Sequence, residues 1–200
     1  MNSRPPLGQP PLTLALVGVN VLVFALSGLV GWSFVADVAL WPVATGFFEP
    51  WQLFTYAFVH TELAHLAFNM LGLWMFGAPL ERLWGARRFA LFYVVSLLMA
   101  GITQLLLNAM LGNEAPTIGA SGGLFGLLLG FAVEFPHARI VPLIPPIPMP
   151  ARVAVTLYGL IELVLGVTGT ASGVAHFAHL GGLLGGALVL LAWRAGTSRA

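Results

Sequence analysis

The chain of 200 residues contains no cysteine and no lysine, and only 8% of its residues are charged. Without cysteine it forms no disulfide, has no thiol nucleophile and offers no thiolate ligand to zinc. A soluble domain carries about 25% charged residues, so charges this sparse do not cover a soluble globular surface. The net charge of +1 also argues against a nucleic-acid partner.

Apolar residues fill the chain instead: 58% of it is hydrophobic and its mean hydropathy is +0.93. This composition predicts an integral membrane protein surrounded by the lipid bilayer. A spanning helix needs about 20 mostly apolar residues. We therefore expect an all-α polytopic bundle of six transmembrane helices, with the shorter, glycine-rich segments ending inside the protein. The candidate segments are residues 12–30, 63–79, 89–111, 121–135, 152–167 and 178–193.

The domain organisation expected from this pattern is one membrane core over residues 12–194, between a disordered proline-rich tail over 1–11 and a short tail over 195–200. The apolar run at 12–30 exceeds the roughly 7–15 residues of a signal-peptide core, so we expect a retained helix. The aromatic-rich loop 31–62 is predicted to lie at the membrane interface. Six prolines in residues 136–150 predict an extended, stiff linker.

The arginines indicate the orientation. With the N-terminus inside, all eight fall in the inner segments, which are the first tail, residues 80–88, residues 136–152 and the last tail. The outer loops hold none, in agreement with the positive-inside rule. We therefore expect cytoplasmic termini in a bacterial inner membrane. Glu81 and Arg82 are expected to anchor the inner end of the second helix.

Polar residues gather near the outer ends of the second, fourth and sixth segments, namely His65, Asn69, Ser121 and His179. Serine needs a base to take its proton, and neutral histidine is the usual one. Ser121 and His179 therefore predict a nucleophile and its base. Donors for an oxyanion are available from His65, Asn69 and the Ser121 backbone. We expect no carboxylate near His179 at that depth, so the predicted site is a dyad.

Glycine spacing predicts how the two catalytic candidates meet. Small residues let membrane helices approach closely, and both helices carry them at helical spacing. Phe125 shares a helix face with Ser121 and can pack on the His179 ring. The glycines concerned are Gly122, Gly126 and Gly130 beside Ser121, and Gly182 and Gly186 beside His179.

Other interpretations of the polar residues remain open. His176 and His179 have a spacing that could bind a metal, although a carboxylate partner would have to come from a loop, and we expect neither metal nor cofactor. Glu162 is costly in lipid, and we expect it to face the protein as a structural partner. A proton-coupled transporter using His65, His179 and Glu162 is an alternative function. The role of His60 is left open.

Over residues 51–193 or so, the pattern resembles the rhomboid intramembrane serine proteases. Three motifs carry the resemblance, in order along the chain. They are His60, His65 and Asn69; Gly119, Ala120, Ser121 and Gly122; and Ala178, His179, Gly182 and Gly186.

The resemblance implies cleavage of transmembrane protein substrates in or near their membrane helix, at a site open to the extracytoplasmic side. It assigns Ser121 as nucleophile, His179 as base, and His65 and Asn69 to the oxyanion hole. Two positions depart from the family pattern: Gln52 replaces an arginine in the first loop, and Phe125 replaces a tyrosine. A non-catalytic relative that binds transmembrane helices is the second alternative. The substrate and the oligomeric state are not assigned.

Overall fold

Apolar helices make up most of the structure, a computed structural model that describes residues 9–142, 146–170 and 173–197. Five helical segments are long and apolar enough to cross a membrane, and a sixth, α7, is apolar but shorter. The chain is therefore an all-α polytopic membrane protein, as predicted. The long elements are α1 (Pro11–Val30), α4 (Leu63–Gly72) continued by η3 (Leu73–Gly77) and α5 (Ala78–Trp84), α6 (Ala86–Leu111), α7 (Ser121–Glu134), α8 (Ala151–Thr168) and α9 (His176–Thr197).

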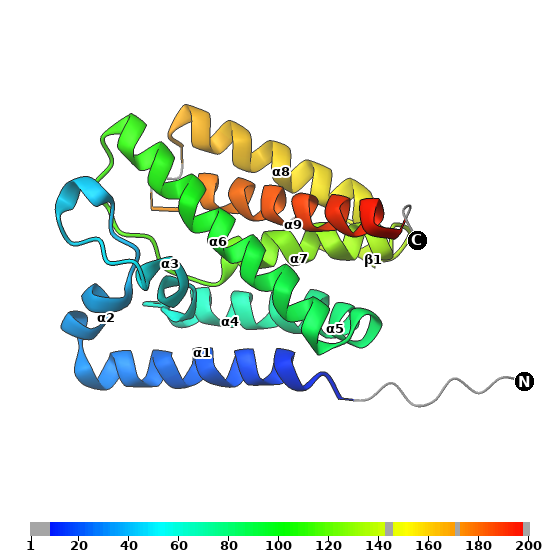
Figure 1. Ribbon diagram of the computed structural model, residues 1–200, viewed down its shortest axis with the longest axis horizontal. Helices are drawn as coiled ribbons and strands as arrows, with labels where there is room; N and C mark the ends of the chain where they lie inside the picture. Colours follow the sequence, from blue (N-terminus) through cyan, green and yellow to red (C-terminus); the bar gives the residue numbers. More distant parts are fainter. Residues whose placement is uncertain (1–8, 143–145, 171–172, 198–200) are drawn as a thin grey trace, which may run out of the picture.

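The long helices lie side by side and alternate in direction, so that α1 begins and α9 ends at the same end of the bundle (Figure 1). Helix α7 begins part-way along the bundle, because the chain after α6 turns inward before the helix starts (Figure 1). This explains why α7 has only 14 residues. It also puts Ser121, its first residue, within the bundle.

The core forms where α6, α7 and α9 meet, and α1 and α8 lie at the periphery. In the most apolar window of α9, 50% of the residues are buried, against 11% in α1 and 17% in α8. The outer helices expose rows of leucine and valine, which are favourable next to lipid. Large buried side chains of the core include Tyr56, Phe89, Phe92, Leu97 and Leu127.

The second spanning segment runs past its predicted end. The expected segment ended at position 79, yet the helix continues to Trp84. A π-helical turn, η3, precedes the proline, which stands in the first turn of α5. Proline has no N–H to donate, and the π-helical turn before it already interrupts the regular i→i−4 pattern of the helix.

Glu81 connects this segment to α1 and does more than anchor its own helix. Its carboxylate accepts hydrogen bonds from the backbone N–H of Leu12 at 2.9 Å and of Thr13 at 2.7 Å, and from the Thr13 hydroxyl. The two backbone N–H groups belong to the first turn of α1 and have no partner within that helix. Negative charge is also favoured there by the helix dipole. Arg82 lies over the Trp74 ring, 5.8 Å from its centroid.

Two stretches expected to be loops contain regular structure. The first, between α1 and α4, folds into α2 (Trp32–Val38), η1 (Val43–Thr45), α3 (Gln52–Thr55) and η2 (Tyr56–Phe58). The second, expected to be an extended linker, instead pairs β1 (Arg139–Ile140) antiparallel with β2 (Met149–Pro150). Residues 143–145 lie outside the described residues. So do 1–8 and 198–200, which hold most of the first expected tail and half of the second.

Gln52 holds the first loop together. Its side-chain oxygen accepts from the backbone N–H of Trp41 and Glu49, both at 3.2 Å. Its nitrogen donates to the carbonyls of Phe47 and Asp37. The side chain is 2% exposed. Gln52, which departs from the family pattern, therefore holds the loop together by hydrogen bonds inside it.

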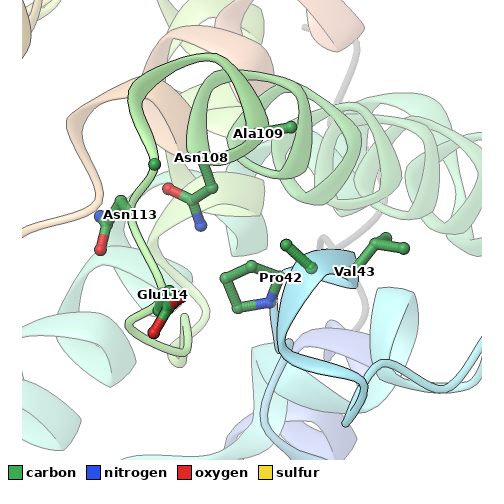
Figure 2. Close-up of a pocket in the computed structure, with 8 residues that line it drawn as sticks. Pro42, Val43, Asn108, Ala109, Asn113 and Glu114 are labelled. Carbon is green, nitrogen blue, oxygen red and sulfur yellow. The ribbon is translucent and has the colours of Figure 1, made fainter.

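The first loop also packs against the end of α6, where the two enclose a small cavity of about 70 Å³ (Figure 2). Pro42 and Val43 form one wall and Asn108 and Ala109 another. Ser121 and His179 are not among its lining residues. A space of this size fits one or two waters, so we interpret it as a packing gap between loop and helix.

Candidate active site

The backbone just before Ser121 is held by the first loop. Leu40 and Thr117 exchange two backbone hydrogen bonds of 3.0 and 2.9 Å. Two residues on, the Gly119 N–H donates to the Tyr56 carbonyl at 2.9 Å. Since these bonds join segments far apart in the sequence, the position of Ser121 depends on the fold of the first loop.

His60 and His65 complete this support. The Ala120 N–H lies 3.4 Å from His60 Nε2, which accepts it, and the two imidazole rings meet edge to face at 4.8 Å. Burial and the neighbouring His65 lower the pKa of His60 to about 4. His60 is therefore neutral near pH 7 and keeps the lone pair that accepts from Ala120. Sequence reasoning left its role open.

Gly119 is required by geometry. Its φ of +107° lies in the region that side chains rarely adopt. A Cβ at this position would stand 2.7 Å from Cε1 and Nε2 of His65. The His65 ring thus lies directly against the backbone two residues before Ser121, so this oxyanion candidate is close to the predicted nucleophile.

Asn69, the other oxyanion candidate, is 4% exposed. Its Nδ2 donates to the His65 carbonyl at 2.8 Å. An amide nitrogen carries two hydrogens, so one remains for another acceptor. Among the described residues, none donates to Asn69 Oδ1.

Ser121 and His179 are brought together. The distance from Ser121 Oγ to His179 Nε2 is 2.7 Å, which is a hydrogen bond. Ser121 opens α7, and the N–H groups of a first helical turn have no partner within the helix. The Ser121 hydroxyl therefore belongs to the end of α7 that carries free backbone donors and the positive end of the helix dipole.

Close packing of α7 and α9 produces this contact. A Cβ added at Gly182 would overlap the Gly122 carbonyl oxygen, and one added at Gly186 would stand 3.2 Å from the Gly126 Cα. The two glycine stripes therefore pack as predicted, except at the C-terminal end of the α7 stripe. There a Cβ on Gly130 would meet Trp84, Leu80 and Phe92, and not α9.

Gln104 of α6 fixes the start of α9. Its Oε1 accepts from the Ala178 N–H at 3.0 Å, and its Nε2 donates to Asn108 Oδ1 at 2.8 Å. Ala178 lies in the first turn of α9, and its N–H is shared between Gln104 and the Ala175 carbonyl, also at 3.0 Å. The bond fixes the backbone next to His179. Sequence reasoning missed Gln104, although a buried amide in a membrane helix is a signal for a structural or functional contact.

A carboxylate lies beside His179, contrary to the expectation of none. Glu162 Oε2 of α8 is 3.0 Å from His179 Nδ1 and 2.5 Å from His176 Nδ1. The prediction failed because the rotation of α8 about its axis depends on packing against α9, which spacing within one helix does not reveal. The carboxylate partner considered for a metal thus comes from a helix and not from a loop. Glu162 does face the protein, as expected.

The chain is similar to known rhomboid proteins. The rhomboid domain family matches residues 48–195. Rhomboid protein 1, mitochondrial, of Saccharomyces cerevisiae is 36% identical over 91% of this chain and 52% of its own length. Rhomboid protease GluP of Bacillus subtilis is 32% identical over 90% of this chain and 34% of its own length. Rhomboid protease GlpG of Enterobacter sp. is 28% identical over 61% of this chain and 42% of its own length. The chain therefore spans about half or less of these relatives.

Proposed function

Because the chain belongs to the rhomboid family, we propose that it is an intramembrane serine endopeptidase that cleaves transmembrane proteins in or near their membrane helix. The observation that carries the proposal is the hydrogen bond of 2.7 Å between Ser121 Oγ and His179 Nε2. Two of the similar proteins, GluP and GlpG, are named proteases. The family and the contact support the same chemistry.

In the first step, His179 Nε2 takes the Ser121 proton while Oγ attacks the carbonyl carbon of the scissile peptide bond. A tetrahedral intermediate forms, with negative charge on the former carbonyl oxygen. The protonated His179 then gives its proton to the leaving amine nitrogen, the C–N bond breaks, and an acyl-enzyme remains.

In the second step, His179 removes a proton from water, which attacks the ester carbon. The ester bond to Ser121 Oγ breaks and Oγ regains its proton from His179. Each half-reaction needs Nε2 to begin without a proton. Hydrolysis also needs water, so we propose a site open to the extracytoplasmic side, with cytoplasmic termini as the arginines indicate.

We assign the oxyanion to the Ser121 backbone N–H, His65 and Asn69. The contact of His65 with Gly119 and the first-turn donors of α7 support this assignment. Preorganised donors of this kind typically contribute about 10²–10³ each to kcat. The remaining Asn69 hydrogen would have to reach the oxyanion without breaking the bond to the His65 carbonyl.

The test uses the purified chain in liposomes with a panel of single-span substrates. We expect cleavage by the native chain and labelling of Ser121 by a fluorophosphonate. Ser121→Ala and His179→Ala should each abolish cleavage, and the double variant should be no worse, because nucleophile and base act as a unit. Cleavage by well-folded Ser121→Ala protein would refute the proposal. Binding of substrate helices without cleavage or labelling would favour the non-catalytic alternative.

Within the described residues, no specific contact favours the transporter alternative. Glu162 is bound by histidines next to Ser121. Glu81 is the other carboxylate of the described helical bundle that is shielded from solvent, and it accepts hydrogen bonds from the first turn of α1. Both carboxylates are therefore engaged by fixed partners, which does not favour a proton path across the membrane.

A further inference from the structure

One carboxylate oxygen lies close to two histidine side chains at the proposed active site. Glu162 Oε2 of α8 stands 2.5 Å from His176 Nδ1 and 3.0 Å from His179 Nδ1. The other nitrogen of His179, Nε2, holds Ser121 Oγ at 2.7 Å. The exposed fraction of the Glu162 side chain is 14%, and those of the histidines are 7% and 9%. Carboxylate, imidazole and hydroxyl, carried by three helices, are therefore neighbours, each within 3.0 Å of the next.

We propose that Glu162 is a positioning residue that makes this site a Ser121–His179–Glu162 triad. The inference rests on the proposed function. A neutral imidazole carries its proton on one nitrogen, and the partner of that nitrogen decides which. A carboxylate at Nδ1 selects the Nδ1–H tautomer, which leaves the Nε2 lone pair directed at Ser121. The same charge stabilises the imidazolium formed when Ser121 loses its proton.

His176 holds the carboxylate in place for this task. Its Nδ1 makes the directed hydrogen bond to Glu162. His179 Nδ1 is close to the same oxygen, but none of the described groups meets hydrogen-bond geometry with it. Catalytic hydrogen bonds in ligand-free sites are often poorly aligned and tighten when substrate binds. His176 therefore acts as the fixed support, and His179 remains free to align during the reaction.

The distances favour direct hydrogen bonding between the Glu162 carboxylate and the histidines over a metal ion bound by all three side chains. The ligand atoms of Glu162, His176 and His179 all lie within 4.8 Å of one another, and the residue types suit Zn²⁺. However, bonds of about 2.0–2.1 Å in a tetrahedral zinc site keep neighbouring ligand atoms about 3.3 Å apart. The spacing of 2.5 Å between His176 Nδ1 and Glu162 Oε2 is shorter than this. It is a short hydrogen bond, somewhat below the roughly 2.7–2.9 Å of most charge-assisted N–H···O bonds.

Glu162→Gln tests the triad, because it keeps the shape and removes the charge. In a Ser-His-Asp protease the equivalent change costs about 10⁴ in kcat. We expect roughly 10- to 100-fold here, since the charge is partly exposed to water. KM should stay within about twofold, and fluorophosphonate labelling of Ser121 should slow by the same factor as kcat. The matched control is Glu134→Gln, the same change at the exposed far end of α7, which should leave kcat unchanged.

The outcomes separate this inference from the proposed function. If the native chain neither cleaves substrate nor labels, the proposed function fails. If the native chain cleaves and Glu162→Gln retains its full kcat and labelling rate, the enzyme is a protease but Glu162 does not position His179. Equal losses in Glu162→Gln and Glu134→Gln would also overturn the inference.

Two further measurements are made on the native protein. Nitrogen-15 NMR of histidine-labelled native protein, assigned by comparison with His179→Gln, should show His179 protonated on Nδ1 and not on Nε2. The opposite tautomer would overturn the proposal. Dialysis of the native protein against EDTA should leave kcat unchanged. Loss of activity that only Zn²⁺ restores would mean that the cluster holds a metal in place of the proton contact.

Discussion

The Phe125 ring lies flat on the His179 imidazole, with 4.3 Å between the ring centroids and 6° between their planes. Phe125 is one helical turn beyond Ser121, so the same helix that carries the hydroxyl also carries the surface on which the imidazole rests. The stacking fixes the plane of the ring and therefore the direction of its Nε2 lone pair toward Ser121. Only the flat face of residue 125 is needed for this contact.

Phe125→Ala should therefore lower kcat by about tenfold or more, because misplacement of about 1 Å costs on the order of 10²-fold in well-oriented reactions. Phe125→Tyr keeps the flat face and should stay within about threefold of the native kcat. Steady-state cleavage in liposomes measures both. Equal activities of the alanine and tyrosine variants would show that stacking does not orient the base.

Gly119→Ala should abolish most cleavage. The new Cβ would press on the His65 ring, and the residue would be held at a φ of +107°. Gly31→Ala is the matched control, since Gly31 has a φ of +90° with nothing within 4 Å of the added Cβ. Both variants should lose about 1–3 kcal/mol of stability, because a residue with a Cβ rarely adopts a positive φ. Only Gly119→Ala should lose activity at a temperature where both remain folded. Loss of activity in both would assign the effect to strain alone.

The sequence was sufficient for contacts that depend on spacing along a single helix. The facing glycines of α7 and α9 and the i+4 relation of Phe125 to Ser121 belong to this kind. It was insufficient for Glu162 and Gln104, because their partners lie on neighbouring helices whose rotation is set by packing. It also missed the folding of the first loop, where the buried Gln52 side chain makes hydrogen bonds with four different residues. No helix or strand period specifies a set of side-chain bonds inside an irregular loop.

His60 should make stability depend on pH. Its pKa falls from 6.5 to about 4 on folding, mainly through burial. The unfolded chain therefore binds the proton more tightly, and stability is highest above about pH 6.5 and falls as the pH drops toward 4. The loss should be of the order of 2–3 kcal/mol. His60→Gln keeps an acceptor for the Ala120 N–H without titrating, so its Tm should fall less between pH 7 and 4.5. His137→Gln, at an exposed histidine, should keep the native pH slope.

The predicted orientation can be tested on α6 and its neighbours. Helix α6 has 26 residues and is about 39 Å long at 1.5 Å per residue, which exceeds the roughly 30 Å of the hydrocarbon core. Positions 87 and 114, just inside and just beyond its two ends, must therefore face opposite sides of the membrane. Both are exposed, as is position 139 after α7.

The chain has no native cysteine, so a single introduced cysteine reports one position. In intact cells, a membrane-impermeant thiol reagent should label Glu114→Cys, in the loop that leads to Ser121. It should label Arg87→Cys and Arg139→Cys only after the membrane is broken, because arginines favour the cytoplasmic side. The reverse pattern would put the start of α7 on the cytoplasmic side and overturn the proposed outward-facing site. Labelling of all three cysteine variants in intact cells would contradict the assignment of α6 as a transmembrane helix, since the two ends of such a helix cannot both lie on the outer side of the membrane.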